Sequence, residues 1–463
     1  MPGCPCRAPK KRGVCGSAGH RLRSLRASRS GHDRKHQASV RRISTNTRLL
    51  LWIDRWFGGP VCGLLTIVRR AAWLASRQLP EAPPHSVLFL KVAEQGSTVL
   101  AYDAIRRAVE RFGRNNVFFM VFEENRFIVD LLGLIPVENV LVVETSSPWA
   151  MLRSCCRRLL EVRRRKIDVC IDMEFFSRSS AAIAFLTGAR RRIGFHTYFR
   201  EGPYRGDLMT HRVLYNPHLR TSQAFSSLVC AIDTDPGKLP TLPFVLPSSP
   251  ALPILTPAPE EREAMRRLFG NLGMSPNHRL ILLNANASDL LPLRKWPEEN
   301  YAALARRLLE GFADLTVAFT GSMEEADRTA DLVRNVGSTR CLCLAGRTTL
   351  RQLVIAYGLA EVLVTNDSGP AHFAALTEID VVALFGPETP LLFSPSGSRS
   401  HPVWAGLACS PCVNALNNRQ SACRDNECMQ AITVGQVFEM VSRIYRTRTG
   451  RLADGPPAGP GQA

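Results

Sequence analysis

The stretch EVLVTNDSGPAHFAALTEIDVVALFG, Glu361 to Gly386, decides the fold class of this chain. An apolar run (EVLV) ends in Asn-Asp-Ser-Gly-Pro, a helical pattern starts at once, and a second apolar run (VVALFG) follows that helix. Strand, helix and strand in close succession predict a βαβ unit with two parallel strands. A plain turn needs no such concentration of hydrogen-bond donors, so the turn also predicts a site for an anionic group.

The same alternation runs through two long regions of the chain. In the first, the strand-like runs SVLFLKV, NVFFMVF, ENVLVVE and IDVCIDMEF are each followed by a helical pattern. In the second, RLILLNANA, LTVAFTG and TRCLCLAG precede the stretch quoted above. Repeated βα units predict an α/β protein with two doubly wound, Rossmann-like parallel-sheet domains that face a central cleft. Eight prolines between residues 233 and 259 prevent both helix and central strand there, and predict a linker.

These patterns predict seven consecutive segments. They are a basic disordered tail (1–47), an amphipathic helical segment (48–85), a first Rossmann-like domain (86–232), a Pro-rich linker (233–259), a second Rossmann-like domain (260–432), a C-terminal helix (433–449) and a disordered tail (450–463).

The positive charge of the chain is concentrated at its start. The formal net charge is +19, and residues 1–48 carry thirteen Lys and Arg against the single acid Asp33. Because most of the basic excess lies in one polar tail, we expect no nucleic-acid partner for the folded part. The basic start is not followed by the apolar core of a secretory signal, so we expect a cytoplasmic protein.

The segment RLLLWIDRWFGGPVCGLLTIVRRAAWLA (48–75) is the part of the sequence most similar to a membrane element. Its longest apolar run, 61–68, is far shorter than the roughly 20 residues that span a bilayer. Tryptophans beside arginines fit an amphipathic anchor that lies on the inner face of the plasma membrane. An ordinary helical hairpin packed on the first domain fits equally well.

Polar residues follow three strands of the second domain. VTNDSGPAH provides Ser368, Gly369 and a helix start whose free N–H groups favour phosphate, and His372 can donate to a phosphate oxygen. NANASDLLPLRKWP adds Asn286, Ser288, Arg294 and Lys295, where a cation beside a donor loop suits a diphosphate. TGSMEEAD places Glu324 and Glu325 where a carboxylate could accept from ribose hydroxyls. Taken singly, each could be a helix cap or a solvated pair, but together they predict a nucleotide diphosphate site.

TNDSGPAHFAALTEIDVVALFGPETP, with the upstream RKWPEENYAALARRLL and TGSMEE, resembles glycosyltransferase family 9, the family of lipopolysaccharide heptosyltransferases. The resemblance extends from about Ser86 to Arg448. It implies a GT-B fold and inverting, metal-independent transfer, with the sugar nucleotide held by the C-terminal domain and no cofactor required. Carried over by position, Asp367, Ser368, Gly369 and His372 form the diphosphate loop and Lys295 is the phosphate-binding lysine. Glu324 lies near the nucleoside, with Glu325 as the alternative register.

The first domain departs from the family pattern at its first loop. Heptosyltransferases carry a Gly-Asp pair there whose aspartate is taken as the catalytic base, but KVAEQGSTVLAYD has Gly96 and Ser97. A serine cannot by itself remove the proton of the acceptor hydroxyl. Glu94 is therefore our first candidate for the base, while Gly96 and Ser97 are candidates for acceptor binding. Asp172 and Glu174, in CIDMEFFSR, are the alternates for the base and are expected to face the same cleft.

Four cysteines in CSPCVNALNNRQSACRDNECM, namely Cys409, Cys412, Cys423 and Cys428, have a spacing that loosely fits a structural zinc site. Disulfides and free thiols are the alternatives.

The resemblance predicts transfer of a heptose from an ADP-heptose-like donor to a lipid-linked lipopolysaccharide-core or other surface-glycan acceptor in a bacterium. A catalytically silent GT-B protein that binds glycan or nucleotide, or a sugar-nucleotide epimerase of the same fold, is the alternative. The sequence lacks the phosphate loop of ATPases, the G-x-G-x-x-G of dehydrogenases, the H-E-x-x-H of zincins and the G-x-S-x-G of hydrolases.

Overall fold

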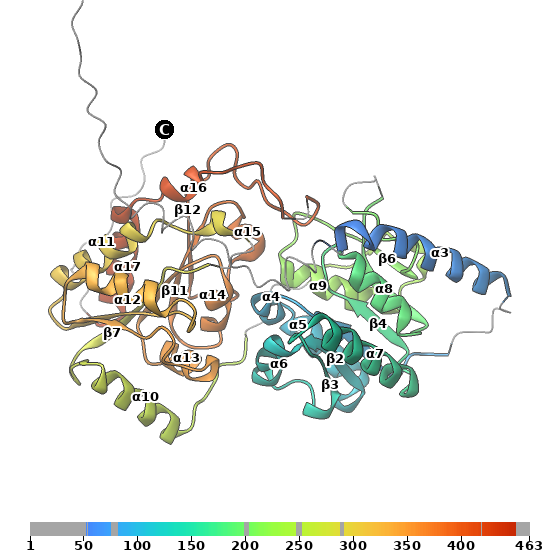
Figure 1. Ribbon diagram of the computed structural model, residues 1–463, viewed down its shortest axis with the longest axis horizontal. Coiled ribbons are helices and arrows are strands. Elements are labelled where there is room, and N and C mark those ends of the chain that lie inside the picture. Colours follow the sequence, from blue (N-terminus) through green and yellow to red (C-terminus); the bar gives the residue numbers. More distant parts are fainter. Residues whose placement is uncertain are drawn as a thin grey trace, which may run out of the picture. The chain divides into compact units, whose positions relative to one another are not determined.

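A computed structural model describes residues 52, 54–75, 82–198, 203–246, 252–287, 291–417 and 419–450. All of them belong to one compact unit, Ile43–Ala463. The predicted tails, apart from Gly450, and the predicted site residue Ser288 lie outside the described residues. The described part contains two α/β halves, each built on a parallel sheet (Figure 1).

The N-terminal half contains a six-stranded sheet in the order β3-β2-β1-β4-β5-β6, and every neighbouring pair is parallel. Its strands are β1 (Val87–Leu90), β2 (Val117–Phe122), β3 (Val140–Val143), β4 (Val169–Asp172), β5 (Arg191–His196) and β6 (His211–Leu214).

The C-terminal half repeats this topology in the order β12-β11-β10-β7-β8-β9, again with all neighbours parallel. Its strands are β7 (Arg279–Asn284), β8 (Leu315–Phe319), β9 (Cys341–Cys343), β10 (Val362–Asn366), β11 (Asp380–Phe385) and β12 (Ser400–Trp404). Both sheets have the strand order of a doubly wound fold, as the sequence pattern predicts.

Helices connect the strands and cover the faces of both sheets (Figure 1). In the N-terminal half they are α3 (Gly58–Ala75), α4 (Gln95–Leu100), α5 (Tyr102–Phe112), α6 (Arg126–Leu132), α7 (Pro148–Arg164), α8 (Arg178–Leu186) and α9 (Thr221–Cys230). In the C-terminal half they are α10 (Pro259–Asn271), α11 (Glu298–Gly311), α12 (Ala326–Val336), α13 (Leu350–Tyr357), α14 (Gly369–Ala374), α15 (Pro390–Phe393), α16 (Glu427–Gln430) and α17 (Val434–Arg448).

The central strands of each sheet are buried on both faces, which explains why strands such as β1 and β11 are almost entirely apolar. In β1, Val87 and Phe89 pack into one hydrophobic cluster, while Leu88 and Leu90 pack into the cluster on the opposite face. Successive side chains of a strand point to opposite faces, so a strand covered on both sides needs a continuous apolar run.

The doubly wound order places the predicted site loops side by side. In each sheet the strand order reverses next to the first strand, between β1 and β4 in one half and between β7 and β10 in the other. Ligands of such folds bind outside the carboxyl ends of the strands at this reversal. The loops that follow β1 and β4 carry Glu94 and Glu174, and those that follow β7 and β10 carry Asn286 and Ser368.

The two halves are in contact through buried side chains. Val99 of α4 and Ile128 of α6 belong to the same hydrophobic cluster as Phe373 of α14. In the opposite direction, Ala415 of the segment between β12 and α16 is buried in the main cluster of the N-terminal half, where Leu416 packs against it. The halves therefore touch where the sequence predicts a central cleft.

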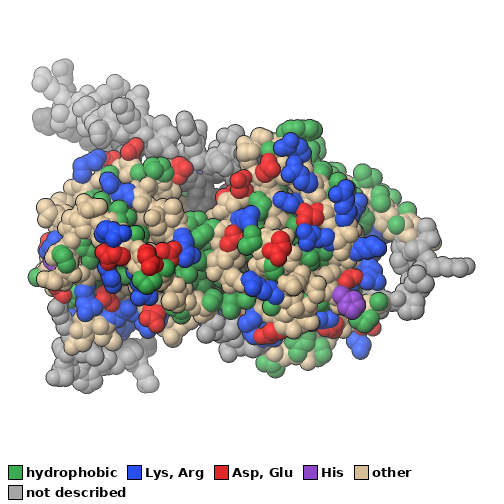
Figure 2. Space-filling model, turned by 90° about the horizontal axis from the view of Figure 1, so that it is seen from below, with side chains coloured by type: hydrophobic (Ala, Val, Ile, Leu, Met, Phe, Trp, Pro, Cys, Tyr) green, Lys and Arg blue, Asp and Glu red, His purple; other side chains and the backbone are tan. Residues whose placement is uncertain are grey.

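In the described part of the Pro-rich region, 233–246 and 252–258, there is no strand, and short 3-10 helices lie at Ala231–Asp233 and Pro236–Lys238. Helix α3 packs against α8, and no helix in the described part of the chain is long and apolar enough to cross a membrane. On the face shown in Figure 2, Lys and Arg side chains are interspersed with Asp and Glu.

Candidate active site

The loop from β10 into α14 is held in place by Asn366, whose side chain is fully buried. Its Oδ1 accepts from the backbone N–H of Trp296 (3.0 Å) and from the hydroxyl of Tyr301 (3.1 Å). Its Nδ2 donates to the carbonyl oxygens of Ala285 (3.2 Å) and Asn286 (3.1 Å). A buried amide with all of these partners fixes the loops after β7 and β10 against one another. Sequence analysis assigned no role to Asn366.

His372 lies in the first turn of α14 and is almost fully buried. Its Nδ1 has no hydrogen-bond partner among the described residues. Burial lowers the pKa of His372 to about 4, an effect that the carboxylate of Asp367 opposes and the guanidinium of Arg294 reinforces. The imidazole is therefore neutral at neutral pH, and it faces Gly96 of α4, where an added Cβ would lie 2.7 Å from His372 Cδ2.

A compact charge cluster lies behind this loop. Arg294, which precedes α11, pairs with the buried carboxylate of Glu388 after β11, and its Nε lies 3.7 Å from Asp367 Oδ2. Arg294 also donates to the backbone oxygen of Asp367 (3.4 Å). Burial raises the pKa of Glu388 well above its usual value; Arg294 opposes this rise, and Asp367 adds to it. The cluster joins the ends of β7, β10 and β11.

Four buried polar atoms of this region have no hydrogen-bond partner among the described residues: His372 Nδ1, Asp367 Oδ2, Glu388 Oε1 and Arg294 Nε. Buried polar groups are nearly always satisfied, and one left without a partner costs roughly 1–3 kcal/mol. Several such atoms at one strand edge indicate a place where a polar ligand completes the hydrogen bonding. Backbone N–H groups at the start of α14 add donors, although α14 has only six residues.

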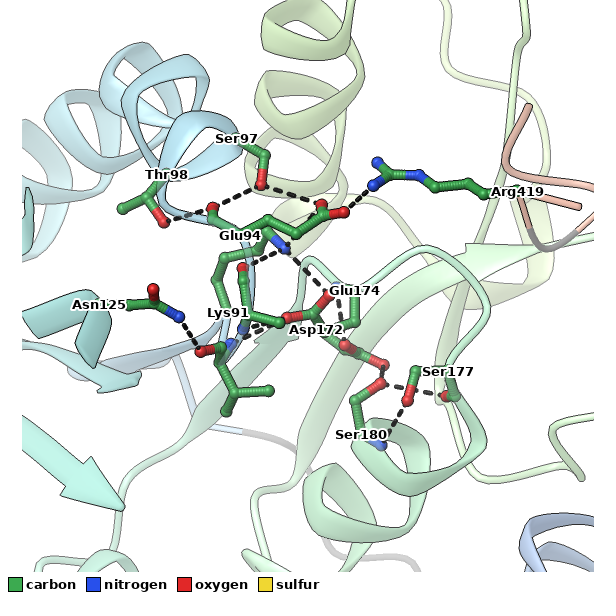
Figure 3. A network of polar contacts seen from close by, with 12 residues as sticks. Lys91, Glu94, Ser97, Thr98, Asn125, Asp172, Glu174, Ser177, Ser180 and Arg419 are labelled. Atoms are coloured by element: carbon green, nitrogen blue, oxygen red, sulfur yellow. Dashed lines mark hydrogen bonds and ion pairs between the residues drawn. The ribbon is translucent and has the colours of Figure 1, made fainter. Parts of the chain in front are cut away.

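On the N-terminal side, the loop after β1 is organised by Lys91 (Figure 3). The Lys91 side chain is fully buried, and its Nζ donates to the carbonyl of Ala93 (2.7 Å) and to Glu174 Oε2 (3.0 Å). The other oxygen of Glu174 accepts from the backbone N–H groups of Val92 (2.9 Å) and Ala93 (3.0 Å). Burial lowers the pKa of Lys91, while Glu174 holds it up. Lys91 and Glu174 thus link the ends of β1 and β4.

Glu94 lies between two cations. Its carboxylate pairs with Arg419, which enters from the segment after β12, and lies 3.6 Å from Lys91 Nζ (Figure 3). The hydroxyl of Ser97 donates to the backbone oxygen of Glu94 (2.9 Å) and to its Oε2 (3.3 Å). The backbone of Glu94 is left-handed, with φ 66°, a conformation that costs a non-glycine residue roughly 1–3 kcal/mol. Such strain is typical of functional loops.

A family model described as glycosyltransferase family 9 (heptosyltransferase) matches residues 156–422, more than half of the chain. The chain belongs to glycosyltransferase family 9. It is 29% identical over 155 residues to lipopolysaccharide heptosyltransferase 2 of Salmonella typhimurium, covering 33% of this chain and 44% of that protein. It is 27% identical over 231 residues to the Escherichia coli protein of the same name, covering 48% and 61%. The chain thus spans about half the length of these relatives.

Solved structures place this family 9 chain in the GT-B fold. It superimposes on E. coli ADP-heptose lipopolysaccharide heptosyltransferase II with a TM-score of 0.59 at 18% identity, covering 79% of this chain and 99% of the other. A family 9 glycosyl transferase from Veillonella parvula gives 0.59 at 16% identity, covering 78% and 98%. At these identities the likeness concerns the fold. The predicted two-domain α/β architecture is confirmed.

Within this family 9 fold, the neighbours of two predicted residues also lie close to the candidate site. Arg294 donates to the backbone oxygen of Asp367 (3.4 Å), and both Arg294 and the predicted Lys295 are half-buried. Glu324 is exposed. Its neighbour Glu325 turns back towards Gly321, where an added Cβ would meet Glu325 Oε2 at 3.2 Å and Asn286 Nδ2 at 2.9 Å. Arg294 and Glu325 are therefore further candidates for the site, beside the predicted Lys295 and Glu324.

One alternate for the base is not placed as expected. Asp172 is fully buried, pairs with the guanidinium of Arg205 and accepts from the hydroxyl of Ser180 (2.9 Å). Burial also raises the pKa of Asp172. The expectation that Asp172 faces the cleft is wrong, because its side chain points from the end of β4 into the interior. The side chain of Glu174 is more exposed than that of Asp172, but its carboxylate oxygens already accept from Lys91 and from two backbone N–H groups.

The four cysteines do not assemble into a metal site in the described part of the chain. Cys409, Cys412, Cys423 and Cys428 are free thiols, and the described residues contain no group of three or more His, Cys, Asp or Glu side chains placed to hold a metal ion. The segment that carries these cysteines makes two contacts with the N-terminal half that the sequence pattern did not predict. It carries Ala415 into the core of the N-terminal half and Arg419 to Glu94.

Proposed function

We propose that this chain is an inverting glycosyltransferase that moves a heptose from an ADP-linked donor to a lipid-linked lipopolysaccharide-core or related surface-glycan acceptor on the cytoplasmic side of a bacterial membrane. The observation that carries this proposal is the group of buried polar atoms near the ends of β7, β10 and β11 that have no hydrogen-bond partner among the described residues, in which Arg294 and His372 are the groups able to donate to a diphosphate. The family supports the reaction class. A heptosyltransferase of E. coli that was solved with ADP, and with ADP-2-deoxy-2-fluoro heptose, supports the nucleotide; its TM-score is 0.53.

The proposed donor site includes the charge cluster of Arg294, Asp367 and Glu388, which holds the Arg294 guanidinium in position before the donor binds. The diphosphate would accept from backbone N–H groups at Ser368 and Gly369 and from Arg294, whose guanidinium contacts carboxylate and carbonyl oxygens of the described residues. A guanidinium binds phosphate well, because its planar fork of donors matches the phosphate oxygens. His372 would complete the site by presenting a ring N–H to the phosphate. These contacts stabilise the negative charge that develops on the leaving diphosphate.

Glu94 is the proposed base. The acceptor oxygen attacks the anomeric carbon, the bond from that carbon to the diphosphate oxygen breaks, and its electron pair leaves with the nucleoside diphosphate. The proton of the acceptor hydroxyl passes to Glu94. Because Arg419 and Lys91 both favour the ionised carboxylate and weaken it as a base, we propose that Arg419 leaves Glu94 when substrates bind.

A thermal-shift panel of nucleotides and nucleotide sugars tests the donor. A ligand that binds only the folded state raises its stability in proportion to ln(1 + [L]/Kd). We expect ADP and ADP-heptose to shift the melting temperature more than UDP or GDP ligands do. Arg294→Met should abolish the shift in melting temperature caused by ADP, whereas Lys295→Met should only reduce that shift. Equal shifts with adenine, uracil and guanine nucleotides would contradict the proposed ADP-linked donor. An unchanged shift in Arg294→Met would contradict the role of Arg294.

Turnover assays separate this function from its rivals. We expect release of ADP from ADP-heptose only when an acceptor is present, and we expect Glu94→Gln to lower the rate by about 10²–10⁴-fold without loss of the ADP thermal shift. Sugar conversion without an acceptor would indicate an epimerase. Tight ADP binding with no turnover on any acceptor would indicate a silent binding protein, which Ser97 at the family's aspartate position makes a specific alternative.

A further inference from the structure

Exposed apolar side chains are concentrated on α3 and the residues just before it. Of the twenty large hydrophobic side chains that are exposed in the described part of the chain, eight lie between residues 52 and 74. They are Trp52, Trp56, Phe57, Val61, Leu64, Ile67, Val68 and Leu74. Single exposed apolar residues are common on protein surfaces, but a contiguous group is typical of a surface that binds something apolar.

The helix has two faces, and only one of them is used by the fold. Cys62 and Thr66 are buried against the N-terminal half, where an added Cβ on Gly206 would meet the Thr66 hydroxyl at 2.5 Å. On the opposite face Leu64 is 63% exposed and Ile67 is 66% exposed. A helix on the surface of a soluble protein normally directs its polar face outward. In α3 the outward face is apolar, so it lacks a partner within the described residues.

Cations flank this apolar face. Arg69, Arg70 and Arg212 all form ion pairs with the single carboxylate of Asp207. The side chain of Arg70 remains 69% exposed and that of Arg212 45% exposed. Three guanidinium groups on one carboxylate leave a local excess of positive charge. An apolar helix face beside arginines, with tryptophans at one end, is the composition of a helix that lies in the headgroup region of an anionic bilayer.

We propose that the outward face of α3, formed by Val61, Leu64, Ile67, Val68 and Leu74, docks on the surface of a bilayer that contains anionic lipids. The helix lies in the plane of the interface, since no helix of the described residues is long and apolar enough to cross a membrane. The apolar side chains enter the acyl boundary, and Arg70 and Arg212 contact lipid phosphates. This inference does not depend on the proposed transferase reaction, because it rests on a different surface.

Vesicle co-sedimentation of the full-length chain tests the proposal. We expect it to sediment with vesicles of phosphatidylcholine and phosphatidylglycerol, much less with phosphatidylcholine alone, and less as salt is raised. The double variant Leu64→Glu/Ile67→Glu should lower the partition coefficient at least about tenfold, because two apolar side chains then resist entering the bilayer. Val137→Glu changes an equally exposed side chain elsewhere in the N-terminal half and should have no effect.

Each other outcome overturns the proposal. If the double variant sediments like the unaltered chain, another segment, such as the basic residues 1–47, binds the vesicles. Equal binding to neutral vesicles would remove the role of the arginines. Absence of vesicle binding, with a dimer that the double variant makes monomeric in light scattering, would show that a second copy covers the face. The melting temperature of each variant is measured first, so that loss of vesicle binding is not mistaken for loss of folding. The thermal shift caused by ADP then shows separately whether the proposed donor site is intact.

Discussion

The buried imidazole of His372 makes a quantitative prediction about stability and pH. The folded-state pKa of His372 is about 4, mainly because its ring is buried, with a further lowering by the nearby Arg294. In the unfolded chain the pKa returns to about 6.5. Below pH 6.5 the unfolded chain therefore binds a proton that the folded chain does not bind. Because stability rises with pH wherever the unfolded state holds more protons, lowering the pH through this range destabilises the folded chain.

The size of the effect follows from the same two values. Each pH unit between them corresponds to about 1.4 kcal/mol, so the interval from 6.5 to about 4 gives a loss of about 3 kcal/mol. The contribution is fully present above pH 6.5, is lost progressively as the pH falls, and changes no further below about 4. Carboxylates also titrate in this pH range, so the measurement must separate the contribution of His372 from theirs.

The assay compares the melting temperature of the unaltered chain and of His372→Asn at intervals from pH 7.5 to 4. The asparagine keeps a small donor at the position of Nδ1 and removes the titration. We expect the unaltered chain to lose several degrees more than His372→Asn over this range. Saturating ADP should reduce that difference, because a bound diphosphate favours the protonated ring. Parallel pH profiles for the two proteins would refute the burial argument.

Further substitutions test the packing around the site. Gly96→Ala should cost about 1–3 kcal/mol of stability, because the added Cβ would lie 2.7 Å from His372 Cδ2. Gly59→Ala is the matched control, since a Cβ there would have nothing within 4 Å. Equal melting temperatures for the two variants would contradict the contact between α4 and α14. Lys91→Met should cost about 3–5 kcal/mol in denaturant unfolding, because it leaves the carboxylate of Glu174 without its buried cation. Lys91→Met/Glu174→Gln should recover part of that loss, and a fully additive double variant would show that the two residues do not interact.

Much of the fold could be predicted from local patterns. A strand buried on both faces is apolar along most of its length, so β1 and the start of β10 stand out as short apolar runs in the sequence. The glycine and proline of NDSGPAH mark the start of α14, and the alternation of runs and helices implies parallel sheets. The loops after β7 and β10 could be expected to lie together, because parallel strands end at one edge.

The sequence by itself thus determined two doubly wound α/β domains, because that arrangement follows from local alternation of strands and helices. Only the tertiary structure decided which side chains meet at the ends of the strands. Arg294 donates to the backbone oxygen of Asp367, Asp172 is fully buried, and Arg419 crosses from the other half to Glu94. Periodicity reports which face of an element is buried, since that is a local property of the chain. The pairing of two charges more than 300 residues apart depends on how the halves pack, and no local pattern records it.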